Sequence, residues 1–385
     1  MHLFTRAGAA AALAAAALAV AAGPAGAATQ RQATHRHDLF AGNQQALFVQ
    51  TDGLTANQIV TYSRSSTGAL TLAHTYATGG IGGQLTGSQV DFLASQGSLV
   101  YDAASRLLYA VNAGSNTISV FSVFGTQLAL RQVISSGGTF PVSIAVQGNL
   151  VYVLNALGGG TLQGYRQFFG TLVPIPGSSR PLGLNPTQTP QFTSTPGQVA
   201  FSPGGSQLIV TTKGNGSDID VFAVSPFGLL SSAPVVNPEP GAVPFAVAFT
   251  PAGWLVASEA GTNSVALFAL GGDGTVHQLS TVATNEAATC WITADGNTLF
   301  ASDAGGPAVS TVSWSPWGPL TLTATTSTDA GTVDSVLSPD GRFLYVQTGG
   351  AGIVDEFAIG SGGALTSIGS TTVAGAAGGE GIAAS

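Results

Sequence analysis

The chain has 385 residues, 53 of them glycine, and only 7% are charged, with a formal net charge of −8. A negative chain with a single lysine is a poor partner for nucleic acid, because phosphate contacts require clustered Lys or Arg. The 44% content of hydrophobic residues argues against disorder. Abundant turn-forming and β-branched residues favour an all-β protein with many tight turns.

The N-terminus has the three-part layout of a cleaved secretory signal. Arg6 precedes an apolar run from Ala7 to Ala22, and the small-residue stretch PAGAAT follows. We therefore expect residues 1–28 to be a signal peptide, residues 29–45 a flexible segment, and the mature protein to be secreted. The alternative is a retained membrane anchor, for which the run is short. No stable membrane span is expected after cleavage.

Residues 46–385 contain seven segments with one order of elements: a strand, a Gly-containing turn, a second strand, a polar turn, a third strand, an x-G-x-L turn and a fourth strand. The second strands read ALFVQT, LLYAVN, LVYVLN, QLIVTT, WLVASE, TLFASD and FLYVQT. Their central residues, spaced 61, 43, 57, 46, 45 and 45 apart, are Phe48, Tyr109, Tyr152, Ile209, Leu255, Phe300 and Tyr345. A period in the mid-forties with four short strands is typical of a β-propeller blade. The sequence predicts a seven-bladed β-propeller of four-stranded antiparallel blades.

The two long intervals and the two ends of the repeat array are also interpretable. ATGGIGGQLTGSQVDFLASQGS and QFFGTLVPIPGSSRPLGLNPTQTPQFTSTPG lengthen the first and third connections, and we expect both to be loops on a propeller face. The chain ends in EGIAAS, a first-strand pattern with no second strand after it, whereas ALFVQT lacks a first strand before it. We expect these two segments to pair and close the ring, which removes an open sheet edge.

The units SPDGRFLYVQTGGAGIVDEFAI and FSPGGSQLIVTTKGNGSDIDVFAV resemble the YVTN-type and lactonase-type seven-bladed propellers, which include bacterial 6-phosphogluconolactonases and muconate-lactone enzymes. In lactonase-type members the corresponding blade usually reads P-R-H at the start of its inner strand and N-E at the end of the next. Here Pro244 is followed by Phe245 and Ala246, while Glu259 keeps the acid position. Antiparallel pairing predicts that Phe245 and Glu259 share a face. The cation and the imidazole that the resemblance implies are missing there.

Two functions from different classes follow. In the first, which the missing residues favour, the protein is a binding or interaction module for a small polar ligand or for a protein or cell-envelope partner. In the second, it hydrolyses lactones with Glu259 as general base and Lys213 supplying positive charge, since ring opening needs a proton acceptor and stabilisation of an oxyanion.

Polar residues recur three positions past each central residue, where a ring at the channel mouth would bind a sugar or an organic acid. The alternative is that they satisfy the backbone of nearby turns. The residues are Thr51, Asn112, Asn155, Thr212, Ser258, Asp303 and Thr348. At the next position stand Asp52, Lys213 and Glu259, which form either a salt bridge between the last two or a charged rim that orients a ligand.

Aromatic residues precede the glycine of the x-G-x-L turn in four units: Phe124, Phe169, Phe227 and Trp317. Such hairpin tips usually carry Asn, Asp or Ser. If the rings project outward, they form an apolar arc for a partner or a carbohydrate. Otherwise each ring folds back over the neighbouring blade.

The remaining signals predict neither a cofactor nor a metal site. His74 and His277 lie far apart in outer strands, and Asp218 and Asp220 point to opposite faces of one strand. Cys290, the only cysteine, is expected to be a buried small residue rather than a nucleophile. We expect a monomer.

Overall fold

The structure is a computed structural model that describes residues 45–315 and 318–385. The predicted signal peptide, nearly all of the segment 29–45, and Trp317 therefore lie outside the described residues. Within the described ranges, no helix is both long enough and apolar enough to cross a bilayer.

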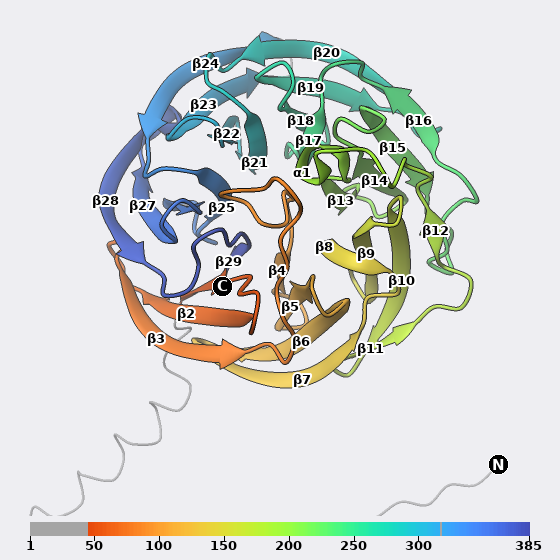
Figure 1. Cartoon of the computed structure of the whole chain (residues 1–385). Coiled ribbons are helices and arrows are strands. Elements are labelled where there is room, and N and C mark those ends of the chain that lie inside the picture. The colour runs from red at the N-terminus through yellow and green to blue at the C-terminus, as the bar shows by residue number, and fades with distance from the viewer. Residues whose placement is uncertain (1–44, 316–317) are drawn as a thin grey trace, which may run out of the picture. The chain divides into compact units, whose positions relative to one another are not determined.

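The described residues form a ring of seven antiparallel sheets (Figure 1), as the repeat predicts. We number the blades by their strands. Blade 1 is β29-β1-β2-β3, blade 2 is β4 to β7, blade 3 is β8 to β11, blade 4 is β13 to β16, blade 5 is β17 to β20, blade 6 is β21 to β24, and blade 7 is β25 to β28. Blade 3 carries one additional short strand, β12, which pairs with β10. The prediction of a seven-bladed propeller is confirmed.

The elements have the following bounds. In blades 1 to 3 they are β1 Ala46–Gln50, β2 Gln58–Arg64, β3 Leu70–Ala77, β4 Leu99–Asp102, β5 Leu107–Asn112, β6 Thr117–Phe124, β7 Gln127–Ser135, β8 Thr139–Gln147, β9 Leu150–Leu157, β10 Thr161–Phe168, β11 Thr171–Pro174 and β12 Arg180–Pro181. In blades 4 and 5 they are α1 Gln191–Ser194, β13 Gln198–Phe201, β14 Gln207–Thr211, β15 Asp218–Ala223, β16 Val235–Pro238, β17 Pro244–Phe249, β18 Leu255–Glu259, β19 Ser264–Leu270 and β20 Val276–Ala283. In blades 6 and 7 they are β21 Thr289–Asp295, β22 Thr298–Asp303, β23 Ala308–Ser315, β24 Gly318–Ser327, β25 Thr332–Leu337, β26 Phe343–Thr348, β27 Ile353–Ile359, η1 Ser361–Gly363, β28 Leu365–Thr372 and, closing blade 1, β29 Ile382–Ala384.

Burial falls from the hub of the ring to its rim. Every residue of the second strands β5 and β26 is buried, whereas the outer strand β20 is largely exposed or half-buried. The second strands pack between neighbouring blades on both faces, so they read as continuous apolar runs. Burial of each central aromatic side chain, such as Tyr109 or Tyr345, contributes about 1.5–3 kcal/mol.

The ring closes between the two ends of the repeat array. β29 pairs antiparallel with β1, with Ile382 opposite Val49 and Ala384 opposite Leu47. The pairing is extended by the Gln50 N–H, which donates to the carbonyl of Gly381 at 2.8 Å. The closure predicted from EGIAAS and ALFVQT is thereby confirmed.

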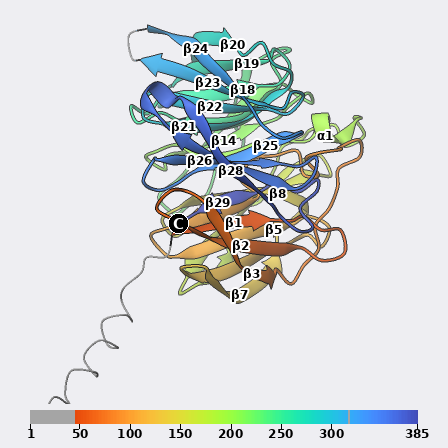
Figure 2. The same ribbon diagram turned by 90° about the vertical axis from the view of Figure 1, so that its left-hand side faces the viewer.

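The first insertion, residues 77–98, runs across the middle of the ring. Figure 1 shows this connection between β3 and β4 in orange, and Figure 2 places it on the same side of the ring as α1. Its Ser95 carbonyl accepts the indole N–H of Trp291 at 2.6 Å, and its Gln96 side chain exchanges hydrogen bonds with the backbone of Ile292. Gly349 lets the connection approach blade 7, because a Cβ there would clash with the Val90 carbonyl oxygen. The insertion is therefore anchored to the hub, not only laid over a face.

Candidate functional site

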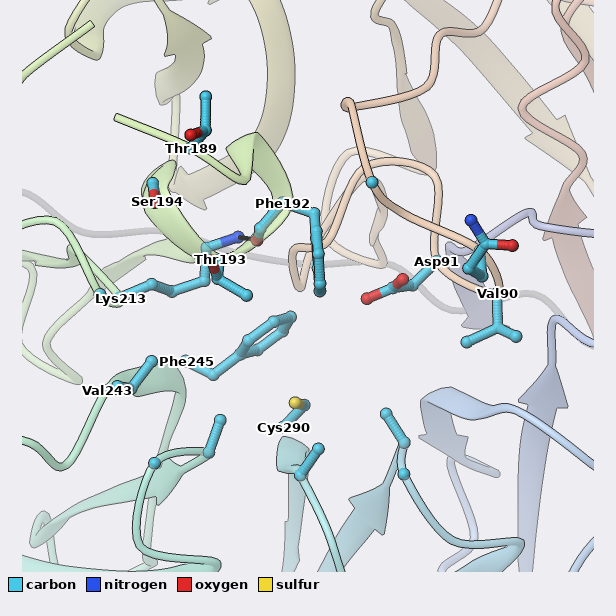
Figure 3. Close-up of a pocket in the computed structure, with 18 of the residues that line it drawn as sticks. Val90, Asp91, Thr189, Phe192, Thr193, Ser194, Lys213, Val243, Phe245 and Cys290 are labelled. Atoms are coloured by element: carbon cyan, nitrogen blue, oxygen red, sulfur yellow. Dashed lines mark hydrogen bonds between the residues drawn. The ribbon is translucent and has the colours of Figure 1, made fainter. Parts of the chain in front are cut away.

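A cavity of about 580 Å³ opens at the end of the channel where the two insertions meet (Figure 3). Its walls come from the β3–β4 connection, from the segment that contains α1, and from the inner strands of blades 5 and 6. The two insertions are joined by a hydrogen bond from the Thr86 N–H to the Gln191 side chain at 3.0 Å. Most of the lining is apolar, and Asp91 and Lys213 are the charged residues that line it among the described ones.

A bulge in each of two inner strands directs a side chain into the cavity. In β21, Thr289 pairs with Asp303 and Trp291 pairs with Ser302, so Cys290 is an extra residue between them. In β17, the register shifts in the same way between Pro244 and Val247, which turns Phe245 inward. Bulges commonly re-aim a side chain next to a functional site. The Phe245 ring forms the floor of the cavity and packs against the buried Trp291 ring, with the two ring centroids 4.7 Å apart.

Lys213 is fully buried and stands over this floor. Its Nζ donates to the carbonyls of Ala94 and Phe192, each at 2.6 Å, and lies 5.2 Å from the centre of the Phe245 ring. The two insertions therefore hold the ammonium through their backbones, and its third N–H remains for a ligand. Burial lowers the pKa of Lys213 to about 8, opposed by the charges of Asp91 and Glu380. Lys213 has a φ of 49°, a strained region for a residue with a Cβ, and such strain is concentrated at functional sites.

Asp91 extends from the β3–β4 connection into the cavity, facing the side that holds Lys213 (Figure 3). Its Oδ1 accepts the hydroxyl of Ser88 at 2.8 Å, and no hydrogen bond to Oδ2 is found among the described residues. Burial raises the pKa of Asp91 to about 6, while the Ser88 hydrogen bond and the charge of Lys213 act in the opposite direction. The result is a carboxylate that is ionised at neutral pH and basic enough to accept a proton.

Other acids lie deeper in the hub, below the cavity. Glu380 Oε1 accepts the N–H and the hydroxyl of Ser95, and burial, followed by the charge of Asp91, raises the pKa of Glu380 well above its usual range. Burial also raises the pKa values of Asp52 and Asp334 to about 7. These acids do not line the cavity, so the charged groups at the cavity itself, among the described residues, are Asp91 and Lys213.

Glu259 faces a different cavity, and the prediction that it shares a face with Phe245 is wrong. Pro244, not Phe245, pairs with Glu259, so the following residue points to the other side of the strand. Glu259 Oε2 accepts the hydroxyls of Ser264 and Thr262, and the side chain lines a second cavity of about 370 Å³ beside Glu239. Burial raises the pKa of Glu259. The structure does not bring Glu259 and Lys213 together, and among the described residues they form no ion pair.

The predicted polar ring does not line the cavity. All seven side chains are buried, and they bond to neighbouring turns and strands, which corresponds to the alternative interpretation: Thr51, Asn112, Asn155, Thr212, Ser258, Asp303 and Thr348. For example, Asn112 bonds to Thr78 and Ser119, while Asp303 accepts the hydroxyls of Thr289 and Ser310. Asp52 is equally enclosed, because its Oδ2 accepts the N–H of Glu380. Of the predicted site residues, Lys213 and Phe245 line the cavity.

Residues 12–159 and 179–378 match the sequence model of the protein family described as Lactonase, 7-bladed beta-propeller. The chain belongs to this lactonase family. A search of curated proteins gives no match.

Several solved structures share the lactonase-family fold. A candidate 6-phosphogluconolactonase from Bacteroides uniformis has a TM-score of 0.73 and 19% identity, covering 89% of this chain and 100% of that one. A protein from Lactobacillus plantarum has a TM-score of 0.72 and 21% identity, covering 89% and 99%. The periplasmic gluconolactonase of Pseudomonas aeruginosa has a TM-score of 0.69 and 19% identity, covering 88% and 98%. At these identities the likeness shows the fold alone.

Three aromatic tips of this lactonase-family chain project into solvent. The exposed fractions of Phe124, Phe169 and Phe227 are 62%, 97% and 80%, so these rings do not fold back over a neighbouring blade. The structure supports the outward alternative for them. Trp317 lies outside the described residues.

Cys290 gives a direct test of the electrostatics of the cavity. The thiol is buried, and burial, followed by the negative charge of Asp91, raises its pKa well above its usual range. We expect a thiol reagent at pH 8 to modify the native lactonase-family protein at least about tenfold more slowly than the urea-unfolded protein. Because Cys290 is the only cysteine, absorbance of the released thiolate reports it alone. Equal rates would contradict the predicted protonated thiol.

No metal site stands out in the part of the chain that the structure describes. There, no three His, Cys, Asp or Glu side chains are grouped closely enough to hold an ion.

Proposed function

We propose that the protein hydrolyses the ring ester of a lactone in the cavity of about 580 Å³, with Asp91 as general base and Lys213 as the group that holds the oxyanion. The observation that carries the proposal is that a carboxylate and an ammonium line one largely apolar cavity, and that among the described residues one carboxylate oxygen and one ammonium N–H have no hydrogen-bond partner. Membership of the lactonase family supports the choice of reaction.

In the proposed reaction Asp91 takes a proton from a water molecule while the water oxygen forms a bond to the carbonyl carbon. The negative charge that develops on the carbonyl oxygen is stabilised by the third N–H of Lys213, in a site where the apolar walls strengthen the interaction. The ring C–O bond then breaks, and Asp91 returns the proton to the departing alkoxide. The product is the open hydroxy acid, and the carboxylate is regenerated.

The lining favours an uncharged, partly apolar lactone. Phe192, Phe245, Val90 and Val243 supply apolar walls, and no arginine or histidine lines the cavity among the described residues. A phosphorylated sugar lactone would bring a phosphate dianion with only Lys213 to face it, and this ammonium already donates to two carbonyls. The phosphate would therefore lose its hydration in the cavity without gaining a partner for its charge, which disfavours its binding.

A lactone panel tests the proposal. Proton release at pH 7 is followed for uncharged five- and six-membered lactones with apolar substituents and for a phosphorylated sugar lactone. We expect turnover of the uncharged lactones, with kcat/KM at least about tenfold higher than for the phosphorylated one. If no lactone in the panel is hydrolysed, the proposal fails.

A second candidate function is binding without turnover. The observation in its favour is that Phe245 and Ala246 stand where the resemblance implies an arginine and a histidine. A thermal-shift screen separates the two functions: a ligand that raises the melting temperature but is not consumed supports binding alone.

We also propose that the protein acts outside the cytoplasm. The proposal is supported by the signal-like layout of residues 1–28. Secretion remains a prediction from the sequence.

A further inference from the structure

Three hairpin tips on the face opposite the cavity expose phenylalanine side chains. Phe124 ends β6, Phe169 connects β10 to β11, and Phe227 connects β15 to β16, in three consecutive blades. Each tip follows the third strand of its blade, whereas Lys213 follows a second strand. Because neighbouring strands run antiparallel, these ends lie on opposite faces of the ring. The tips are therefore separate from the proposed catalytic cavity.

The fold does not require a phenylalanine at position 169. It has a φ of 49°, where a two-residue hairpin turn favours Asn or Asp before Gly, and its ring is 97% exposed. An aromatic residue in this conformation carries a conformational cost, and here no burial within the chain offsets it. The fold of the chain itself therefore gives no reason for an aromatic ring at this position.

Basic side chains accompany the three tips. Arg106 is an exposed residue whose backbone lies beside the first tip, since its carbonyl accepts the N–H of Val123 next to Phe124. Arg131 Nε lies 3.5 Å from the position of a Cβ on Gly170, and Arg166 Nη2 lies 3.0 Å from that on Gly228, the glycines of the other two tips. We call the six residues the basic aromatic arc: Phe124, Phe169, Phe227, Arg106, Arg131 and Arg166.

The charge around the arc is opposite to that of the whole chain. Residues 103–217 contain no Asp or Glu, although the chain has 18 acids and a net charge of −8. Blades 2 and 3 carry four arginines, Arg106, Arg131, Arg166 and Arg180, against Asp102. The molecule is therefore polarised, with Phe124, Phe169 and the three arginines of the arc on its positive part and Phe227 in the neighbouring blade 4. A negatively charged surface orients such a molecule with the arc toward it.

We propose that the basic aromatic arc binds the surface of an anionic lipid bilayer. The phenylalanines enter the boundary between headgroups and acyl chains, and the arginines contact the anionic headgroups, the combination that holds peripheral proteins at membranes. The projecting geometry favours a bilayer over a protein partner, because a fluid surface accepts isolated side chains, whereas a protein interface requires a continuous complementary patch. The arc thereby places the hairpin tips of blades 2 to 4 on the membrane, and the cavity on the opposite face remains open to solvent.

Vesicle co-sedimentation of the full chain tests the proposal. We expect binding to vesicles of phosphatidylcholine with phosphatidylglycerol, and weaker binding to phosphatidylcholine alone. The double variant Phe169→Ser/Phe227→Ser and the double variant Arg131→Gln/Arg166→Gln should each lower the partition coefficient at least about tenfold at low salt. The matched control is Leu279→Ser, an apolar residue that is 51% exposed on β20 of blade 5 and should leave binding unchanged.

The wild-type chain, both double variants and the control share the same N-terminal residues. Differences in vesicle binding among them therefore measure the contribution of the arc. Thermal unfolding checks that each variant keeps its fold, as expected for exposed positions. The proposal is overturned if the wild-type chain does not bind, if it binds both kinds of vesicle equally, or if the phenylalanine variant binds as tightly as the Leu279→Ser control. Because the arc and the cavity lie on opposite faces, lactone hydrolysis in solution should be unchanged in both double variants.

Discussion

Replacing Asp91→Asn should lower kcat for lactone hydrolysis by about 10²- to 10⁴-fold, because the variant removes the group that accepts the proton from water. The amide keeps the size of the side chain and can still accept the Ser88 hydroxyl at its oxygen, so the fold and the cavity are retained. Initial rates at pH 7, together with the thermal unfolding midpoint of each protein, provide the measurement. An Asp91→Asn protein with wild-type kcat would remove Asp91 from the mechanism.

The companion variant Glu259→Gln distinguishes the two carboxylates. Glu259 faces the second cavity, where Ser264 and Thr262 donate to it, so its loss should change kcat by less than about twofold. A large loss in Glu259→Gln with full activity in Asp91→Asn would instead favour the base that the family resemblance implies.

The pH profile of the wild-type enzyme adds a second readout. Asp91 must be ionised to act as a base, so kcat/KM should rise with pH through its pKa of about 6. Lys213 must be protonated to stabilise the oxyanion, so kcat/KM should fall through its pKa of about 8. The expected profile is a bell with its maximum near pH 7. In Asp91→Asn the rising limb should disappear.

The fold could be predicted because the information is local and repeated. The second strands bury all or nearly all of their side chains between blades, so LLYAVN and FLYVQT show the same apolar run. Blade number then follows from counting these runs. Ring closure follows because a first strand without a second can only pair with a second strand without a first.

The site could not be read in the same way, because its two charged groups depend on contacts between distant segments. Asp91 lies in an insertion outside the repeat, and its position is set by the hydrogen bonds of Ser95 to Glu380 and Trp291, residues in blades 1 and 6. One signal was present in the sequence: Asp91 is the only acid in residues 77–98. A carboxylate in an otherwise uncharged insertion at the channel would have been a reasonable candidate.

The direction in which side chains point was the second feature of the site that the sequence did not predict. The repeat places Ser258 and Asp303 correctly at the end of second strands, yet neither side chain lines the cavity. Asp303 bonds within its own blade, and Ser258 bonds to Ala246 of its own blade and to the carbonyl of Cys290 in the next one. The bulge in β17 changes which face Phe245 occupies, and simple alternation along the strand does not anticipate it. Position along the chain was predictable here, whereas orientation was not.

The protein should be most stable in mildly acidic solution and lose stability as the pH rises from 5 to 8. Burial raises the pKa values of Asp52 and Asp334 in the folded state to about 7, and that of Glu380 well above its usual range, whereas in the unfolded chain these acids titrate near pH 4. The folded protein thus binds more protons than the unfolded one over this window, and the free energy of unfolding falls as pH increases.

The size of this effect follows from the same shifts. An acid with a folded pKa of about 7 contributes about 2 kcal/mol at pH 5 that is lost by pH 8, and several such acids act together. Lys213 does not offset the loss, because its folded pKa of about 8 leaves it mostly protonated in both states below pH 8. Thermal unfolding at pH 5, 6.5 and 8 should show a melting temperature that decreases by several degrees. Asp334→Asn, which cannot ionise, should flatten this dependence, and a melting temperature that rises toward pH 8 would mean that the buried acids of the hub are ionised in the folded protein.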